Sequence, residues 1–276
     1  MPTKKINLHL ISDSTGETLS SVARAVLSQF ENIETNDFIW SLVRTKSQLD
    51  KAIEAIRQHP GIVLYTVMQD ELVEQLRKKC YELQLPCIPI LSHIIAEFAN
   101  YLQQTVTNAV GRQHLLDQQY FSRVDAMSYT ITHDDGQANH DYYEADIIII
   151  GVSRTSKSPT SIYLSFRGYK VANIPFVSIE TIPSSIFELK KPLIVGLIIN
   201  PEKLVQIRQS RLNSIGEDSI LDYTDLDRIK QEISECRKLF AKLNCPVIDV
   251  TKRSVEETSA RIIQLLQDKK LKQYSE

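Results

Sequence analysis

The sequence has few cysteines, no long hydrophobic run and no excess of one charge, and each absence narrows the class of protein. Its four cysteines among 276 residues are not spaced as C-x-x-C pairs, so neither a zinc ribbon nor a dithiol redox site is indicated. We expect free thiols in a reducing compartment, and therefore a cytoplasmic protein. No apolar stretch approaches the roughly 18 residues of a membrane span, and the N-terminus lacks the apolar segment of a signal peptide.

The charges are nearly balanced. The 32 lysines and arginines face 34 aspartates and glutamates, which gives a net charge of -2. The basic residues are scattered, with no long basic block, so we expect no partner among nucleic acids or membranes. Hydrophobic residues make up 42% of the chain, enough for a substantial core.

Short apolar strands alternate with amphipathic helices along most of the chain. The first series predicts strands at residues 6–12, 38–43, 62–67 and 87–91, with helices at 18–30, 47–57 and 70–85 between them. The second predicts strands at residues 147–150, 170–177, 192–199 and 246–250, with helices at 158–167, 225–243 and 254–270 among the others. Such alternation predicts right-handed βαβ units. The expected fold class is therefore α/β, with two lobes built on mainly parallel sheets.

The pattern weakens between the two series. We therefore predict an N-terminal α/β lobe at residues 1–104, a linking region at 105–144 and a C-terminal lobe at 145–276. Within the linking region we expect a helical piece at 111–120, a short strand at 129–132 and a turn at 133–137. The turn contains an Asp-Gly pair, which tolerates positive φ.

The most informative stretch begins with four consecutive isoleucines at 147–150. A β-branched run of this kind predicts a buried central strand of a parallel sheet. A small-residue loop follows and ends in Lys-Ser at the start of a helix, which is the layout of a phosphate-binding loop. The residues expected to hold phosphate groups are Gly151, Val152, Ser153, Arg154, Thr155, Ser156, Lys157 and Ser158. The Ser158 hydroxyl is also the expected Mg²⁺ ligand.

One position departs from the usual G-x-x-x-x-G-K-[ST] pattern. Ser156 stands where the second glycine belongs, and that glycine normally lets the backbone approach a phosphate closely. An ordinary nucleotide hydrolase is therefore less well supported. An ordinary turn rich in serine and threonine remains the structural alternative.

The two lobes open in a similar way. With an offset of 140 positions, Thr15 matches Thr155, Gly16 matches Ser156, and Glu17 takes the place of Lys157. Related lobes are one explanation, and chance similarity between Ser/Thr-rich turns is the other. If the lobes are related, we expect only the second to bind nucleotide tightly, because Glu17 would repel a phosphate.

Three segments carry a family resemblance. They are ADIIIIGVSRTSKSPTSIYLSFRGYKVANIPFV at 145–177, LHLISDSTGETLSSVARAVLSQF at 8–30 and the HDDGQ turn at 133–137. Together they resemble the bacterial pyruvate, phosphate dikinase regulatory protein family, and the resemblance extends from about residue 6 to residue 268. The serine at position 156 also fits that family's pattern.

The resemblance implies a bifunctional enzyme. Such an enzyme phosphorylates a threonine of the dikinase with ADP as donor, which leaves AMP. It removes that phosphate with inorganic phosphate, which releases pyrophosphate. A sister group acts on phosphoenolpyruvate synthase, and nothing in the residues distinguishes the two targets. The family's ADP site corresponds to Gly151 through Ser158 here, Mg²⁺ is expected, and a homodimer is left open.

Phosphoryl transfer requires positioning and positive charge more than covalent help from the protein. We expect Lys157 to hold the ADP phosphates, Arg154 to stabilise the charge on the transferring group and Asp135 to accept the threonine proton. Asp13, Asp134 and Asp249 are alternative bases. Each of the four aspartates, Asp135 included, also has a structural alternative as a helix cap, a turn residue or a strand-end residue, which we favour for any single one.

Two further pairs of residues have competing interpretations. Arg208 and Arg211 lie three positions apart on an expected helix, where they either contact the target's phosphate or form a solvated basic face. Tyr163 and Phe166 either stack on adenine or, as we favour, pack in the core. Two other functions stay open, a conventional P-loop nucleotide hydrolase or small-molecule kinase and a non-catalytic nucleotide sensor.

Overall fold

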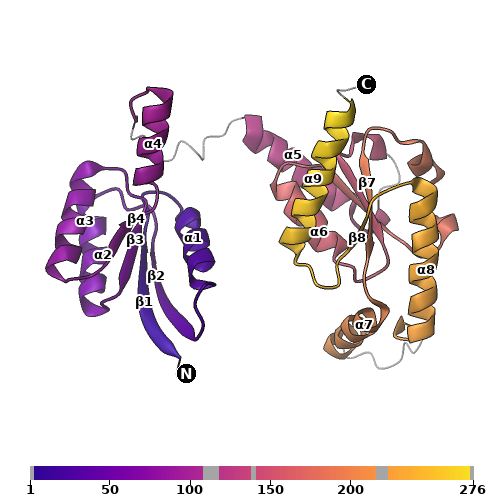
Figure 1. Cartoon of the computed structure of the whole chain (residues 1–276), viewed down its shortest axis with the longest axis horizontal. Coiled ribbons are helices and arrows are strands. Elements are labelled where there is room, and N and C mark those ends of the chain that lie inside the picture. Colours follow the sequence, from indigo (N-terminus) through magenta and orange to yellow (C-terminus); the bar gives the residue numbers. More distant parts are fainter. Residues whose placement is uncertain (1–2, 108–117, 138–140, 216–222, 274–276) are drawn as a thin grey trace. The chain divides into compact units, whose positions relative to one another are not determined.

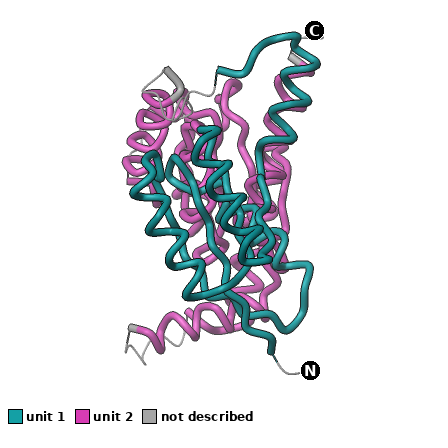
Figure 2. Tube along the Cα trace, turned by 90° about the vertical axis from the view of Figure 1, so that its left-hand side faces the viewer, with its two compact units in different colours: residues 1–115 teal, residues 116–276 magenta. Residues whose placement is uncertain are grey.

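The computed structural model describes residues 3–107, 118–137, 141–215 and 223–273. The chain divides into two compact units, Met1–Leu115 and Leu116–Glu276, which Figure 2 shows in two colours. Among the described residues, no helix combines the length and apolar character that a membrane crossing would need.

In its described residues, the first unit is a four-stranded parallel sheet with four helices (Figure 1). The strands lie in the order β2-β1-β3-β4, and every neighbouring pair is parallel. They are β1 (Lys4–Ile11), β2 (Ile33–Trp40), β3 (Ile62–Tyr65) and β4 (Cys87–Pro89). The helices are α1 (Glu17–Leu27), α2 (Lys46–Gln58), α3 (Asp70–Glu82) and α4 (Ser92–Leu102).

The second unit repeats this plan. Its strands lie in the order β6-β5-β7-β8, again all parallel, which confirms the α/β fold class. They are β5 (Ile147–Gly151), β6 (Val171–Pro175), β7 (Leu193–Ile198) and β8 (Val247–Asp249). The helices are α5 (Gln118–Thr132), α6 (Lys157–Phe166), α7 (Pro201–Ile215), α8 (Leu226–Leu243) and α9 (Val255–Gln273), with 3₁₀ turns η2 (Asp134–Gly136), η3 (Tyr142–Glu144), η4 (Ile179–Thr181) and η5 (Ser184–Glu188).

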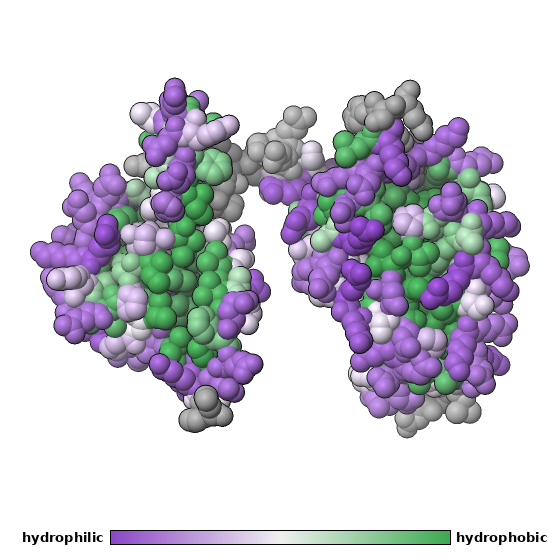
Figure 3. Space-filling model, viewed as in Figure 1, coloured by the Kyte–Doolittle hydropathy of each residue, from purple (hydrophilic) through white to green (hydrophobic). Residues whose placement is uncertain are grey.

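Strand β5 is the centre of the second unit. All four of its isoleucines are fully buried, because β6 and β7 pair with the strand on its two sides and helices cover both faces of a parallel sheet. The β-branched run therefore has the role that the sequence predicts for it. In Figure 3, hydrophilic residues cover the rims of each unit and hydrophobic residues show between them.

The two units share more than strand order. Helix α1 follows Gly16, which is left-handed at φ 86°, and α6 follows Ser156, which is left-handed at φ 61°. The helices begin at Glu17 and Lys157, the same offset of 140 residues found in the sequence. This agreement in topology and loop geometry supports two related units rather than a chance similarity of turns.

The strand predicted at 129–132 is wrong, because these residues form the last turn of α5. The β-branched Thr130, Ile131 and Thr132 suggested a strand. Burial instead follows a helical spacing, with Ala126, Tyr129 and Thr130 buried and Ile131 exposed. The Thr130 hydroxyl accepts a hydrogen bond from the Val171 backbone N–H at 3.1 Å, so the helix is anchored to the start of β6.

Other boundaries also differ from the prediction. Strand β2 begins at Ile33 rather than residue 38, because this edge strand is half-exposed and carries polar residues. Helix α2 is capped by Thr45 in a capping box with Gln48 rather than by Ser47. Of the helical piece expected at 111–120, residues 111–117 lie outside the described residues. The structure groups α5 with the second unit, although the sequence-based division put it in the linking region.

His9 gives the first unit an expected dependence on pH. It is fully buried on β1, where Nε2 donates to the His59 carbonyl at 2.8 Å and the ring stacks on Phe38 at 4.7 Å. Burial lowers the pKa of His9 more than the hydrogen bond to His59 raises it. The unfolded chain therefore binds more protons below its ordinary pKa of about 6.5, so the unit should lose stability as the pH falls from there.

This loss can be measured by urea unfolding at pH 7.5, 6.0 and 5.0. The His9→Phe variant should show a weaker loss at acid pH than the parent protein. His93→Gln, at an exposed position on α4, should behave like the parent. An equal acid loss in all three proteins would contradict the role of His9.

Candidate functional site

The candidate site lies at the carboxyl edge of the second sheet. Strand β5 ends at Gly151, and residues 152–156, here called the β5–α6 loop, lead into α6. The chain pairs β5 with β6 on one side and then returns to pair it with β7 on the other. In open α/β sheets, ligands bind at this kind of switch point, outside the carboxyl ends of the strands.

The β5–α6 loop has an unusual backbone. Arg154 and Ser156 are both left-handed, at φ 73° and φ 61°, a conformation that costs a non-glycine residue about 1–3 kcal/mol. Helix α6 also begins without a side-chain cap from the residues the structure describes. The first-turn N–H groups of the helix are consequently available to an anion.

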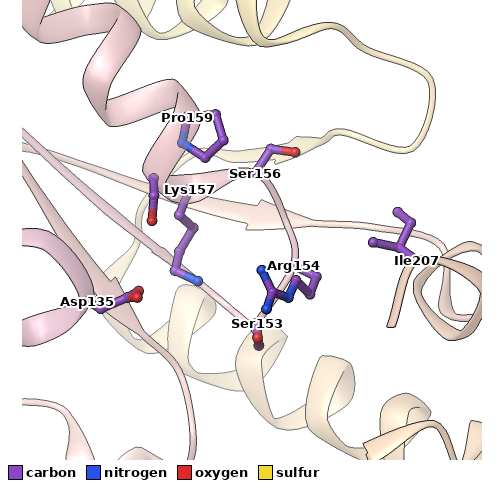
Figure 4. Close-up of a pocket in the computed structure, with 8 residues that line it drawn as sticks. Asp135, Ser153, Arg154, Ser156, Lys157, Pro159 and Ile207 are labelled. Carbon is purple, nitrogen blue, oxygen red and sulfur yellow. The ribbon is translucent and has the colours of Figure 1, made fainter. Parts of the chain in front are cut away.

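A cavity of about 350 Å³ opens beside this loop (Figure 4). Its lining residues are Asp135, Ser153, Arg154, Ser156, Lys157, Ser158, Pro159 and Ile207. In Figure 4 the Lys157 side chain extends from α6 so that its nitrogen lies between Asp135 and Arg154. The structure thus brings together the three residues predicted to be catalytic, and the cavity carries two cations and one carboxylate.

Lys157 is held inside the loop. Its side chain is only 5% exposed, and Nζ donates to the Val152 carbonyl at 3.1 Å. Burial lowers the pKa of Lys157 to about 8, although the charges of Asp135 and Asp134 oppose this change. A phosphate group in the cavity would add negative charge and favour the protonated amine.

Asn173 joins the Asp134–Asp135 turn to the start of α6. This residue is fully buried on β6. Its Nδ2 lies 2.5 Å from Asp134 Oδ1, 2.9 Å from Ser158 Oγ and 3.4 Å from Asp135 Oδ1. Asp135 adopts a left-handed conformation at φ 49°. The turn is thereby fastened to β6, and Asp135 lines the cavity.

Arg208 supports the β5–α6 loop from α7. It is 2% exposed and forms an ion pair with Glu232 on α8 at 2.7 Å. Its Nη1 donates to the Tyr223 carbonyl at 3.1 Å, and its guanidinium lies 4.5 Å from the centre of the Tyr223 ring. The Tyr223 hydroxyl lies 3.3 Å from both Ser153 Oγ and Arg154 Nε. Of the two interpretations left open, a solvated basic face is therefore wrong for Arg208, whereas Arg211 is exposed.

Not every residue predicted to hold phosphate lines the cavity. Val152 and Thr155 are buried, and the Thr155 hydroxyl donates to the Val152 carbonyl at 2.9 Å. These side chains shape the loop from within. Gly151, Val152 and Thr155 could therefore contact a ligand only through their backbone groups. The other five predicted residues, Ser153, Arg154, Ser156, Lys157 and Ser158, line the cavity.

Several alternative residues have local structural roles. Asp13 does not cap α1, whose N-cap position is Gly16, and its carboxylate accepts the Met68 N–H at 2.9 Å. Asp249 accepts the Thr251 N–H at 2.9 Å and forms the turn after β8.

Phe166 is 58% exposed, so the favoured core packing is wrong for that ring. The Tyr163 hydroxyl accepts from Arg167 at 2.8 Å, and neither ring is among the described residues that line the cavity.

Gly151 is required for packing as well as for the turn. A Cβ at this position would lie 2.8 Å from the Leu197 carbonyl oxygen on β7 and 2.9 Å from Thr155 Oγ1. Gly151→Ala should therefore push β5 away from β7 and destabilise the second unit by about 1–3 kcal/mol. Urea unfolding of the full-length protein measures this change. A variant as stable as the parent would show that the strand end can move freely.

Asn173, Arg208 and Tyr223 contribute more to the site than the sequence suggests. Asn173 could have been noticed as a fully polar residue inside the apolar run VANIPFV. The burial of Arg208 matches Leu204 and Leu212, which lie four residues before and after it and are also buried. That spacing indicates an inward-facing arginine. Tyr223 has no signal of this kind.

Comparison with known families identifies the class of protein. A model of the kinase/pyrophosphorylase family matches residues 8–263, which span both units. The chain therefore belongs to the kinase/pyrophosphorylase family and is an enzyme of the kinase/phosphorylase type.

Its relatives carry a more particular name. A protein of Caulobacter vibrioides named as a pyruvate, phosphate dikinase regulatory protein is 48% identical over 260 residues, covering 94% of this chain and 82% of the relative. A protein of Anaplasma phagocytophilum with the same name is 49% identical, with coverage of 96% and 94%. A third, from Bradyrhizobium diazoefficiens, is 45% identical over the full length of both chains. This confirms the family resemblance seen in the sequence.

Proposed function

We propose that this chain regulates pyruvate, phosphate dikinase by phosphorylating a threonine of that enzyme with ADP, which inactivates it, and by removing the phosphate with inorganic phosphate, which reactivates it. The observation that carries the proposal is the cavity at the end of β5, where Lys157, Arg154, Ser158 and Asp135 converge. The family match and the names of the relatives supply the reaction class and the partner.

In the forward direction, the N–H groups at the start of α6 and the Lys157 amine hold the diphosphate of ADP. The threonine Oγ attacks the β-phosphorus, and the bond from that phosphorus to the oxygen bridging the α- and β-phosphates breaks to release AMP. Asp135 accepts the threonine proton, and Arg154 neutralises charge on the transferring group. Each of these residues lines the same cavity.

Removal of the phosphate from threonine uses the same residues of the cavity. An oxygen of inorganic phosphate attacks the phosphothreonine phosphorus, and the bond to the threonine oxygen breaks. Asp135 returns a proton to that oxygen, and pyrophosphate forms where the diphosphate of ADP was held. One cavity thus serves both reactions, because ADP and pyrophosphate both present two linked phosphates.

Mg²⁺ fits the residues at the start of α6. The Ser158 hydroxyl and the Asp134 carboxylate both contact one Asn173 nitrogen, at 2.9 and 2.5 Å, and oxygen is the ligand that Mg²⁺ prefers. When bound, the ion would neutralise phosphate charge.

The alternative function as a conventional nucleotide hydrolase is less well supported by the structure. Such an enzyme would place its metal-binding acid at the end of a neighbouring strand. The aspartate at the end of β8, Asp249, instead accepts a hydrogen bond from the Thr251 backbone N–H.

A labelled transfer experiment tests the proposal. The purified protein is incubated with ADP labelled with ³²P in the β-phosphate and with dikinase already phosphorylated on its catalytic histidine. We expect label on a dikinase threonine, and its release as labelled pyrophosphate when phosphate is added. Transfer only to phosphoenolpyruvate synthase would instead assign the chain to the sister group. ADP binding without transfer to either protein would support the sensor function and overturn the enzymatic one.

The oligomeric state and the compartment stay predictions. Within the first unit, none of the residues of α4 is buried, and Ile94, Phe98 and Leu102 are each more than half exposed. Such a helix offers one surface for the homodimer left open by the sequence. Mass photometry of the full-length protein measures the oligomeric state, and fractionation of cells measures the predicted cytoplasmic location.

A further inference from the structure

The Asn173 amide has hydrogen-bond partners at its nitrogen but none at its oxygen among the described residues. Its Nδ2 is surrounded by three oxygen acceptors, from Asp134 at 2.5 Å, Ser158 at 2.9 Å and Asp135 at 3.4 Å. An amide nitrogen carries only two hydrogens, so Nδ2 can donate to at most two of these three oxygens. The Oδ1 of the same side chain is buried and has no hydrogen-bond donor among the described residues. A fully buried unpaired oxygen is costly.

We propose that Asp134, Asn173 and Ser158 form a divalent-cation site beside the phosphate cavity, with Asp135 left free as the base. The inference rests on the proposed function for its role, and it assigns separate tasks to the two neighbouring aspartates. A half-turn of the Asn173 amide exchanges Nδ2 and Oδ1, groups of nearly the same shape. The unpaired oxygen then faces the oxygens of Asp134 and Ser158.

The backbone keeps these residues in place. The Asn173 N–H donates to the His133 carbonyl at 3.0 Å, which holds the start of the turn against β6. Ser158 is fixed in the first turn of α6. The three oxygen ligands therefore come from three separate segments, none of which must move far to bind an ion. This is the arrangement of a preformed site rather than of an exposed acidic cluster.

The types of ligand indicate a hard cation. A carboxylate, an amide oxygen and a hydroxyl are all oxygen donors, and Mg²⁺ or Mn²⁺ would complete its coordination with water and phosphate oxygens. The described residues contain no group of three or more His, Cys, Asp or Glu arranged to hold a metal. The proposed site accordingly depends on the neutral Asn173 and Ser158, and is of the sparse kind that Mg²⁺ uses beside phosphates.

Asp135 is more exposed than Asp134 and lies farther from Asn173, and both differences suit a base. Its Oδ1 is the most distant of the three acceptors, at 3.4 Å, and its side chain is exposed and lines the cavity. Asp134 is half-buried and makes the closest contact with Asn173. The exposed carboxylate can reach a substrate hydroxyl, and the half-buried one can hold an ion.

The test is Mn²⁺ binding to the full-length protein without nucleotide. Binding is measured as the loss of the free Mn²⁺ signal in electron paramagnetic resonance. We expect one saturable site below about 1 mM. Asp134→Asn should weaken binding at least about tenfold. Asn173→Asp should tighten it, because a carboxylate replaces an amide oxygen. Asp249→Asn, at the end of β8, is the matched control and should bind like the parent.

Three results would overturn the site. They are the absence of a saturable site in the parent, equal binding by Asp134→Asn and the Asp249→Asn control, and a larger loss in Asp135→Asn than in Asp134→Asn. If Asn173 only fastened the turn, Asn173→Asp would repel Asp134 and lower the melting temperature without tighter Mn²⁺ binding. Because no nucleotide or target is present, Mn²⁺ binding without phosphoryl transfer would refute the proposed function alone. Transfer without this Mn²⁺ site would refute the inference alone.

Discussion

Replacing Lys157 with methionine should lower both phosphoryl transfer and phosphorolysis by about 100- to 1,000-fold, the usual effect of removing one group that stabilises transition-state charge. Both directions should fall together, because in the proposed mechanism one amine holds the diphosphate of ADP and of pyrophosphate. Methionine occupies a similar volume and avoids the cost of burying an ammonium group that is only 5% exposed. The melting temperature of the variant should therefore not fall.

Initial rates in both directions, measured with the labelled dikinase, test this expectation. Lys269→Met is the matched control. The Lys269 amine also donates to backbone carbonyls, at 2.7 Å to Lys190 and 2.8 Å to Pro192, but it lies at the start of β7 rather than at the carboxyl ends of the strands. Its rates should equal those of the parent. Lys157→Met rates within about threefold of the parent would reject the role of the lysine.

The Glu232→Gln variant should destabilise the second unit by about 2–3 kcal/mol. Arg208 would keep its charge at 2% exposure but lose its carboxylate partner. Breaking a buried ion pair costs about 3–5 kcal/mol, and the 35% exposure of the Glu232 side chain reduces this figure. The loop should lose order as well, because Arg208 and Tyr223 support Ser153 and Arg154.

Urea unfolding measures the loss, and two further variants locate its cause. Arg208→Met combined with Glu232→Gln should regain part of the stability, because no buried charge then lacks a partner. Asp227→Asn breaks an ion pair on the same helix, in which Asp227 is 95% exposed and lies 3.9 Å from Lys230. It should change stability by less than about 1 kcal/mol. Equal effects of Glu232→Gln and Asp227→Asn would show that burial of Arg208 does not matter.

The fold was largely predictable because strand and helix patterns are local. The isoleucine run specifies the strand β5. Ser254 and Glu257 specify the start of α9 through a capping box, whose two hydrogen bonds measure 2.8 and 3.1 Å. The failures concern places where tertiary contacts decide. Residues 129–132 combine β-branched side chains with a helical burial pattern set by β6, and no local propensity reveals that partner.

The candidate site also has one part that local sequence predicts and another part that depends on tertiary contacts. Ser153, Arg154, Lys157 and Ser158 are consecutive or nearly so, and a strand–loop–helix brings them together without help from distant segments. Asn173 reaches Ser158 in the first turn of α6 from β6, and Arg208 reaches the β5–α6 loop from α7. A polar residue within a strand and an arginine on a helix carry no mark of the acceptors they will meet. Their contacts arise only once the sheet has formed.

Each sheet pairs only strands of its own unit, and this affects how the chain can fold during synthesis. Every strand that pairs with β1, directly or through β3, lies before residue 90, and no strand of the second sheet comes from before residue 147. At a synthesis rate of about 5–20 residues per second, the first sheet would be complete on the order of 10 to 30 seconds before the last strand of the second emerges. During that interval the first unit can fold beside the ribosome, and no strand edge has to wait for a partner from the other half of the chain.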